Sequence, residues 1–171
     1  MPGLLPASVS SDVRNPSYPV KDTDQQRQNS VAAFFGIYNN MLAKGFVTPE
    51  WVADNIDRFL CKVTTFNNFD KSTTVRFMVH FGLYCKTIKN LGTEKHRELL
   101  LRGTKLQSLG CYGLTELGHG SNVRGIETTA TYDPSTREFI LHSPTQTSMK
   151  FWLGNLGKCC QWGVFFAQLI T

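Results

Sequence analysis

Residues 111–122, which read CYGLTELGHGSN, decide the fold of this chain. An apolar run with small residues leads into a glycine-rich turn at Gly118 and Gly120, and β-branched residues of high strand propensity follow from about Ile126. A dinucleotide-binding loop needs a third glycine, with a helix behind it whose N-terminus holds the pyrophosphate. Val123 stands at that place and the following residues favour a strand. The pattern therefore predicts strand, loop, strand, and argues against a Rossmann site.

The part of the chain before Gly103 has the apolar spacing of helices. Thr48 and Pro49 are typical of a helix start, and Gly45 and Gly92 are placed to end helices. Helices are expected at about residues 24–45, 48–63, 72–90 and 93–102. The first residues of the chain are rich in proline and serine and predict an irregular arm.

The helical period disappears after about residue 108. The apolar and alternating runs there predict strands at about residues 109–116, 127–132, 137–141 and 162–170, with a turn at 133–136. The sequence thus predicts an α+β chain: an irregular arm over 1–23, an all-α domain over 24–107, and a β-domain over 108–171. An apolar strand at the last residues would leave a sheet edge open, so the β-domain is expected to continue beyond Thr171.

Composition and charge exclude several kinds of protein. The net charge is +5, but the basic residues are scattered, which argues against nucleic-acid binding. The basic residues of 58–105 form a solvated helical surface or attract an anionic substrate. No apolar run reaches the roughly 20 residues of a membrane helix. The five cysteines are irregularly spaced and the histidines are scattered, so neither a disulfide framework nor a metal site is expected.

Several ordered segments of the sequence together resemble one family, the acyl-CoA oxidases, which are relatives of the acyl-CoA dehydrogenases. The resemblance covers about a third of the chain densely, with a weaker match upstream at 89–96. The segments that carry it are 114–116, 118–122, 127–134, 139–140, 143–145, 150–155 and 167–170.

The resemblance implies a fold and an activity. Residues 108–171 would be the start of a β-barrel-like middle domain that binds FAD and acyl-CoA, and the chain would be the N-terminal portion of a longer flavoenzyme. The enzyme would convert fatty acyl-CoA to trans-2-enoyl-CoA and pass the electrons to dioxygen, giving hydrogen peroxide. A peroxisomal location and a homodimer in the full-length form are implied as well. The catalytic base is expected beyond Thr171, so no catalytic residue is assigned here.

The resemblance also implies which residues contact the cofactor and the substrate. Thr115 matches the position whose hydroxyl and amide bind FAD, and Gly154 matches a second flavin-contacting position. Trp152 would lie beside the flavin ring or in the ordinary core. Ser121 is a candidate contact for the acyl chain or the pantetheine of the substrate. His119 lies within a Gly-His-Gly turn, where shaping the loop is favoured over acting as a base.

Two other readings of the sequence stay open. The chain could belong to an acyl-CoA dehydrogenase, which passes electrons to an electron-transfer flavoprotein, although Asn122 replaces the aspartate common there. It could also be a truncated, non-catalytic protein that keeps a flavin-binding or subunit-binding surface. Reoxidation of the flavin by dioxygen, and not by an electron-transfer flavoprotein, separates an oxidase from the first reading.

Gly154 yields a testable hypothesis about oxygen. Dehydrogenases tend to carry Ser or Thr at this position, so glycine leaves space beside the reactive edge of the flavin. We expect Gly154→Thr in a full-length oxidase to slow reoxidation of the reduced flavin by dioxygen, measured by stopped-flow absorbance. An unchanged rate of reoxidation would contradict this role for Gly154.

Overall fold

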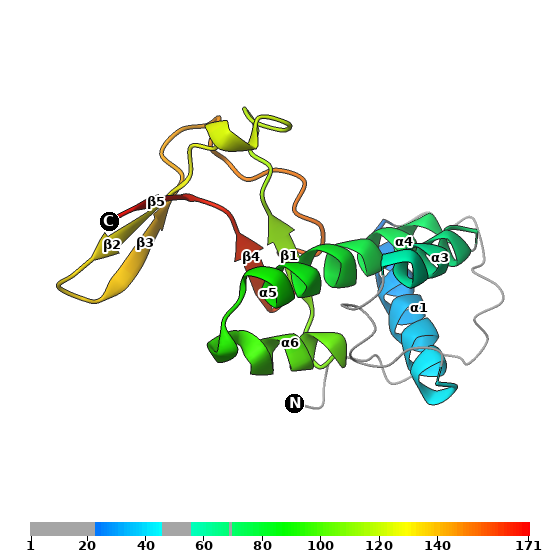
Figure 1. Ribbon diagram of the computed structural model, residues 1–171. Coiled ribbons are helices and arrows are strands. Elements are labelled where there is room, and N and C mark those ends of the chain that lie inside the picture. The colour runs from blue at the N-terminus through cyan, green and yellow to red at the C-terminus, as the bar shows by residue number, and fades with distance from the viewer. Residues whose placement is uncertain (1–22, 46–55, 69) are drawn as a thin grey trace. The chain divides into compact units, whose positions relative to one another are not determined.

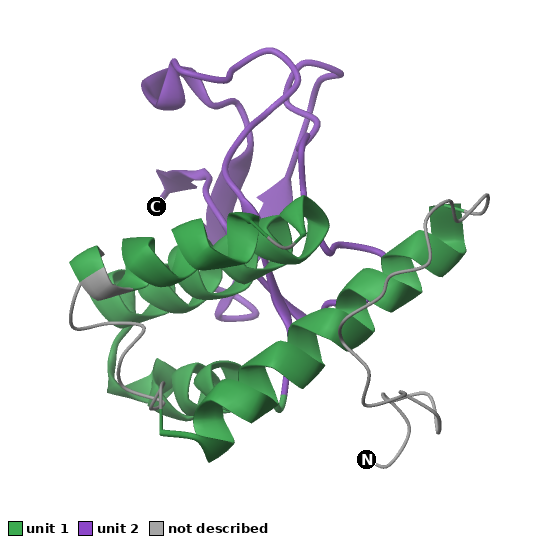
Figure 2. Ribbon diagram, turned by 90° about the vertical axis from the view of Figure 1, so that its right-hand side faces the viewer, with its two compact units in different colours: residues 1–107 green, residues 108–171 purple. Residues whose placement is uncertain are grey.

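The computed structural model describes residues 23–45, 56–68 and 70–171 (Figure 1). The chain divides into two compact units, Met1–Gln107 and Ser108–Thr171, which are coloured separately in Figure 2. The arm predicted for 1–23 lies outside the described residues except for its last residue. The helix start predicted at Thr48 and Pro49 also lies outside them.

The first helix of unit 1, α1, spans Thr23–Ala43 and confirms the helix predicted from the apolar spacing. It ends where expected, because Gly45 takes a left-handed conformation with φ of 69° that glycine adopts without steric cost. Its buried face includes Phe34 and Tyr38. The Tyr38 hydroxyl donates a hydrogen bond to the carbonyl of Thr104 at the end of the same unit.

The helix predicted at 72–90 is present, with an irregularity that the sequence did not predict. It consists of α4 (Lys71–Phe77), a π-helical segment η1 (Met78–Cys85) and α5 (Lys86–Leu91). Asp70 caps its start, since its carboxylate accepts hydrogen bonds from the amides of Ser72 at 3.2 Å and Thr73 at 2.8 Å. The wider turn of a π-helix alters which side chains share a face, so helical spacing alone could not locate it.

Aromatic side chains form the core of unit 1. The ring centroid of Phe77 lies 5.7 Å from that of Phe59 in α3 (Ile56–Asn67) and 5.0 Å from that of Phe81. Phe81 in turn stacks on Tyr38 of α1 at 5.0 Å. These contacts join α1, α3 and the central helix, and each such pair adds about 1 kcal/mol beyond the area it buries.

A short helical connection closes unit 1. The chain leaves α5 at Gly92, forms the 3-10 turn η2 (Glu94–His96), and continues as α6 (Arg97–Thr104). The start of this turn is capped by its own residues, because the Thr93 amide donates to His96 Nδ1 at 3.0 Å. The helix predicted at 93–102 is therefore confirmed, with a 3-10 first turn.

Unit 2 contains two small sheets and no helix longer than the turn η3 (Val123–Gly125). The strand β1 (Gly110–Gly113) pairs in parallel with β4 (Trp162–Phe165). In the second sheet, β2 (Thr129–Asp133) pairs with β3 (Glu138–His142) as an antiparallel hairpin. The remaining strand, β5 (Gln168–Ile170), pairs in parallel with β2.

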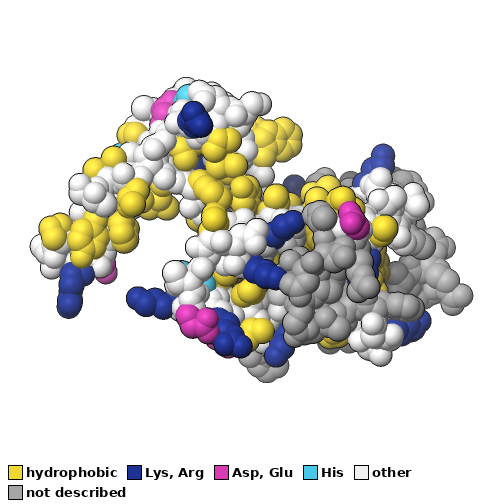
Figure 3. Space-filling view, in the orientation of Figure 1, with side chains coloured by type: hydrophobic (Ala, Val, Ile, Leu, Met, Phe, Trp, Pro, Cys, Tyr) yellow, Lys and Arg dark blue, Asp and Glu magenta, His cyan; other side chains and the backbone are white. Residues whose placement is uncertain are grey.

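The strands correct two details of the sequence prediction. The run 162–170 is not one strand but two, β4 and β5, which belong to different sheets. The described strands also form two separate sheets and no closed barrel, so the α+β class is confirmed while barrel closure is not seen among these residues. Apolar side chains of β2 and β3 remain on the surface (Figure 3), among them Phe139 and Ile140.

The predicted turn between β2 and β3 is present, but it extends one residue further than expected, because Arg137 belongs to the turn and β3 begins at Glu138. The Asp133 carboxylate accepts hydrogen bonds from the hydroxyl of Ser135 at 2.6 Å and from its amide at 2.8 Å, and these bonds lower the pKa of Asp133. Arg137 has φ of 59° and its amide donates to the Asp133 carbonyl at 2.8 Å. The turn therefore fixes the register of the hairpin at Asp133 opposite Glu138.

Among the described helices of the whole chain, none is long and apolar enough to span a membrane.

The buried histidine of unit 1 makes its stability depend on pH. His80 is fully buried, with Nε2 2.9 Å from the Gly103 carbonyl oxygen. Burial lowers its pKa from 6.5 to about 4, against the opposing effect of that hydrogen bond. Below about pH 6.5 this histidine is protonated in the unfolded chain, whereas in the folded chain it stays neutral until about pH 4. We expect the free energy of unfolding to fall by about 3 kcal/mol between pH 6.5 and 4 on this account.

This pH dependence is measured by urea unfolding followed by far-ultraviolet circular dichroism at several pH values. His80→Gln should flatten the dependence in this window, whereas His142→Gln, a change of an exposed histidine in β3, should leave it unchanged. Equal slopes for the wild-type chain and His80→Gln would contradict the assignment.

Candidate functional site

Two segments of unit 2 that are distant in sequence hydrogen-bond to each other. The amide of Phe151 donates to the carbonyl of Thr115 at 2.9 Å, and the amide of Leu117 donates to the carbonyl of Met149 at 2.9 Å. Between them, Glu116 and Lys150 form an isolated antiparallel bridge. The glycine-rich loop is thus held against the segment that leads to Trp152.

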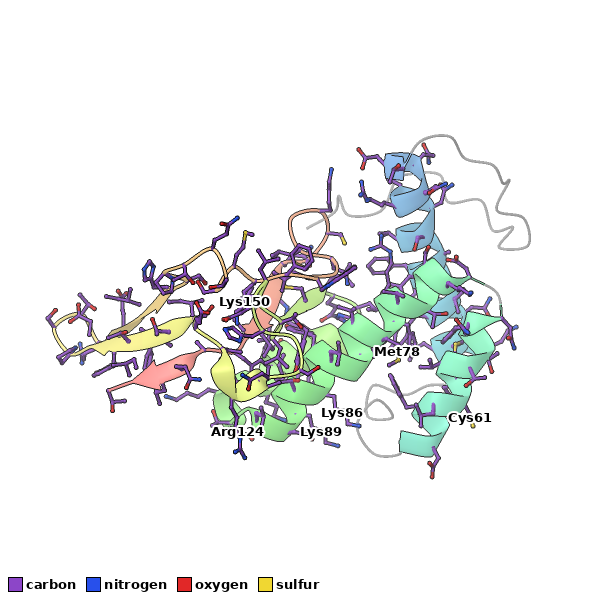
Figure 4. All side chains as sticks on the ribbon, turned by 90° about the horizontal axis from the view of Figure 1, so that it is seen from above. Cys61, Met78, Lys86, Lys89, Arg124 and Lys150 are labelled. Carbon is purple, nitrogen blue, oxygen red and sulfur yellow. The ribbon has the colours of Figure 1, made fainter. Side chains whose placement is uncertain are left out.

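A buried ion pair lies at this bridge. Lys150 Nζ is 3.1 Å from Glu116 Oε1, and the side chains are only 9% and 0% exposed. The same ammonium donates to the carbonyls of Leu114 at 3.2 Å and Phe166 at 2.7 Å. Figure 4 labels Lys150, which is surrounded by the loops of unit 2. One side chain therefore ties together three segments of the chain.

The Glu116 carboxylate also receives backbone donors from a further segment. The amide of Glu127 donates to Oε2 at 2.7 Å, and the amide of Thr128 donates to Oε1 at 2.9 Å. Burial by itself raises the pKa of Glu116, but these amides and Lys150 outweigh it and lower the pKa to about 2. Glu116 is accordingly ionised at neutral pH, and its low pKa and its filled hydrogen bonds make it a poor proton acceptor.

A second carboxylate fixes the tip of the glycine-rich loop. Glu127 accepts hydrogen bonds from His119 Nε2 at 2.8 Å, from the hydroxyl of Thr147 at 2.9 Å and from the hydroxyl of Thr145. The bonds from Thr145, His119 and Thr147 lower the pKa of Glu127. His119 is therefore held by a carboxylate inside the loop, a geometry that favours a loop-shaping role for it.

The structure brings together three of the residues predicted to bind a cofactor. Thr115 is half-buried, and neither its amide nor its hydroxyl has a hydrogen-bond partner among the described residues. Trp152 directly follows Phe151, which bonds the Thr115 carbonyl, and the Gly154 amide donates to the Trp152 carbonyl at 3.0 Å. Thr115, Trp152 and Gly154 therefore lie on two linked segments.

The conformation of Trp152 is unusual for a bulky residue. Its side chain is 83% exposed and its φ is 62°, in the left-handed region. A large side chain adopts this region at an energetic cost, and such residues cluster at binding sites. The alternative that Trp152 belongs to the core of unit 2 does not fit this exposure.

Ser121 is exposed on the glycine-rich loop, where its carbonyl accepts from the Val123 amide at 3.0 Å. Its place as a substrate contact stays a prediction.

A metal ion would need clustered ligands, and the described residues contain no group of three or more His, Cys, Asp or Glu that could hold one.

The ion pair itself was missed by the sequence analysis. Glu116 falls at the end of a predicted apolar strand, and a carboxylate in such a strand indicates a buried partner. Nothing in the spacing identified Lys150 as that partner, because the contact is formed only by the bridge between the two segments. The contacts of Glu127 were missed for the same reason, because its partners His119, Thr145 and Thr147 lie in two segments that are distant from each other in the sequence.

Comparison with known proteins gives the family. No family model matches the chain. Peroxisomal acyl-coenzyme A oxidase 1 of Arabidopsis thaliana is 52% identical over 94 residues, which is 54% of this chain and 14% of that protein. Acyl-coenzyme A oxidase 3, peroxisomal, of the same plant is 35% identical over 147 residues, or 85% of this chain and 22% of that protein. This chain is homologous to a segment of the acyl-CoA oxidases.

Solved structures of acyl-CoA oxidases have the same fold. Acyl-CoA oxidase 1 of Yarrowia lipolytica superposes with a TM-score of 0.72 at 28% identity, covering 87% of this chain and 21% of that one. Acyl-CoA oxidase 3 of the same yeast gives 0.70 at 32% identity, covering 86% and 20%. The chain thus spans about a fifth of the length of these acyl-CoA oxidases, which fits the portion predicted from the sequence.

The buried ion pair predicts a large effect of removing one partner. Lys150→Met leaves the Glu116 carboxylate buried without its cation, so we expect unit 2 to lose about 3 kcal/mol of stability. Urea unfolding followed by tryptophan fluorescence in a Trp51→Phe background reports on Trp152 and Trp162, which both lie in unit 2.

The exposed Arg124 provides the control cation of unit 2, and Arg124→Met should change the stability by less than about 0.5 kcal/mol. The double variant Glu116→Gln with Lys150→Met should lose less than the sum of the two single variants, because the charges are coupled. Additive losses would show that the two groups do not interact.

Proposed function

We propose that residues 108–171 hold part of the FAD site of an acyl-CoA oxidase. The observation that carries the proposal is the position of Thr115: its unpartnered amide and hydroxyl lie beside the segment of Trp152 and Gly154. Support also comes from the relatives, including a Caenorhabditis elegans acyl-CoA oxidase-2 structure bound with FAD, ascaroside-CoA and ATP, at 28% identity and a TM-score of 0.53.

The residues present fit a flavin. The isoalloxazine ring is flat and apolar on its faces and carries hydrogen-bond acceptors along one edge. The Thr115 amide and hydroxyl supply donors for such an edge, and the exposed ring of Trp152 supplies a flat surface. Gly154, whose amide donates to the Trp152 carbonyl, carries no side chain that would fill this site. Bound FAD would supply the acceptor for the hydride that leaves the β-carbon of the substrate.

The work of this chain would be to bind and orient the cofactor. The Glu116–Lys150 pair positions Thr115 and Trp152, and the Glu127–His119 contact shapes the glycine-rich loop. The catalytic base that removes the α-proton would lie beyond Thr171 in the full-length protein, because Glu116 is ionised but enclosed by its donors. The 171-residue chain alone would then bind FAD without turning over substrate.

In the full-length protein the reaction would convert fatty acyl-CoA to trans-2-enoyl-CoA, with dioxygen reduced to hydrogen peroxide. A peroxisomal location follows by analogy, because the curated relatives are named peroxisomal. A homodimer is part of the same proposal. The oxidase is favoured over a dehydrogenase because these relatives are named oxidases and because Gly154 would leave the flavin edge open.

The proposal is tested by titrating the 171-residue chain with FAD and following flavin fluorescence. We expect saturable binding, with Trp152→Leu and Thr115→Val each weakening it by about tenfold, since each removes about 1.4 kcal/mol of stacking or hydrogen bonding. Addition of a long-chain acyl-CoA should give no peroxide.

Two matched variants serve as controls in the same titration. Trp162→Leu alters a tryptophan of β4, and Thr136→Val alters a threonine of the hairpin turn. Both should bind FAD as the unchanged chain does. An equal loss in the controls, or no binding at all, would contradict a preformed flavin site, and peroxide production would contradict the placement of the base.

A further inference from the structure

The sheet of β3, β2 and β5 leaves the outer side of β3 open. In the order β3-β2-β5, the strand β3 pairs with β2 on one side and with no other strand among the described residues. All of its residues are exposed. An edge strand presents backbone N–H and C=O groups that can pair with a further strand. The outer edge of β3 is therefore available for strand pairing.

The strand β3 has none of the features that usually protect such an edge. Protected edges carry lysine, proline or a β-bulge. Residues 138–142 read EFILH, and they pair with β2 at consecutive positions without a bulge. Apolar side chains remain exposed along the strand (Figure 3): Phe139 is 59%, Ile140 56% and Leu141 54% accessible to water.

The residues of β3 are complementary to themselves when two copies of the strand run antiparallel. If Ile140 lies opposite Ile140 of the second copy, Phe139 lies opposite Leu141 and Glu138 lies opposite His142, each pair occurring twice. Cross-strand pairs of apolar residues, and of an acidic with a basic residue, stabilise a sheet. The imidazole of His142 can also donate an N–H to the Glu138 carboxylate.

Neighbouring registers lose this complementarity. A pairing centred on Phe139 places Glu138 opposite Ile140, and one centred on Leu141 places Ile140 opposite His142. Each of these sets a charged or polar side chain against an apolar one. The sequence of β3 therefore favours the register centred on Ile140, and the partner that fits it best is a second copy of the same strand.

The opposite edge of the sheet is less suited to the same contact. The strand β5 has only three residues and carries no charge, and an antiparallel pair centred on Leu169 would place Gln168 opposite Ile170. Ile140 and Ile170 nevertheless have equivalent places in the sheet, because both are paired with Thr131, one on each side of β2. The two isoleucines therefore form a matched pair for experiments.

We propose that two copies of this chain associate through β3, with the strands antiparallel about Ile140 and the two sheets joined into one. The contact is isologous, so each copy contributes the same residues. It is also small, and we expect a dissociation constant in the micromolar range. Since Thr115, Trp152 and Gly154 lie outside this sheet, the association requires no flavin and goes beyond the proposed function.

The first test is sedimentation velocity of the 171-residue chain without FAD, over a series of concentrations. We expect a monomer–dimer equilibrium. Ile140→Lys should raise the dissociation constant by at least about tenfold, because it removes an apolar pair and places two ammonium groups opposite each other. Ile170→Lys, at the equivalent place on β5, should leave the constant unchanged, and circular dichroism checks that both exposed substitutions keep the fold.

The second test fixes the register by cross-linking, in a chain with the exposed Cys61 changed to Ser. Residues opposite each other in an antiparallel pair have Cα atoms about 5 Å apart, within the range of a disulfide. Ile140→Cys should therefore form a disulfide with its own copy under oxidised glutathione. Trypsin cleaves after Arg137 and Lys150, so the product is peptide 138–150 joined to itself.

The exposed Thr131 supplies the control for random collisions. Thr131→Cys lies on the same face but one strand further in, so its two copies would be about 14 Å apart and should not join. Three results would overturn the proposal: a monomer at every concentration, equal weakening by Ile140→Lys and Ile170→Lys, or cross-linking of Thr131→Cys as fast as that of Ile140→Cys. Because FAD is absent throughout, none of these results bears on the flavin proposal.

Discussion

The buried ion pair between Glu116 and Lys150 is the interaction on which unit 2 depends. A charge removed from water is costly unless its hydrogen-bonding capacity is filled. Here the Glu116 carboxylate accepts hydrogen bonds from the amides of Glu127 and Thr128. The Lys150 ammonium donates to the carbonyls of Leu114 and Phe166. Satisfying the two charges thus forces four stretches of chain into one arrangement. Thr115 and Trp152 owe their proximity to that arrangement, since each is a near neighbour in sequence of one member of the pair.

Local patterns predicted the helical unit well and the β unit only in part. The helix end expected at about residue 63 was wrong, since α3 continues to Asn67. The apolar spacing around Phe34 and Phe77 and the stop at Gly45 were sufficient for α1 and the helix at 71–91, because each feature acts within a few turns. The hairpin at Asp133 was predictable for the same reason. The division of 162–170 into β4 and β5 was not, because it is set by which strand each half meets. Parallel pairing joins segments far apart, and no local propensity specifies it.

The candidate site shows the same limit. Thr115, Trp152 and Gly154 were identified by resemblance to a family, and the structure adds that two paired segments carry them. The exposure and left-handed backbone of Trp152 could not have been anticipated from the sequence, because tryptophan is expected to avoid both. Ser121 shared the same sequence motif, and its role as a substrate contact stays a prediction.

The parallel pairings also determine in what order the β unit can assemble. The hairpin of β2 and β3 needs only a short turn, so it can form early and alone. In contrast, β1 must pair with β4 and β2 with β5 across sequence separations of 52 residues (Gly110 to Trp162) and 39 residues (Thr129 to Gln168), and closing such long segments costs entropy before any contact compensates it. Residues 108–171 are therefore expected to fold slowly, because their parallel strand pairings are long-range. During that interval, the apolar strands at the end of the chain are exposed and open to pairing with other chains.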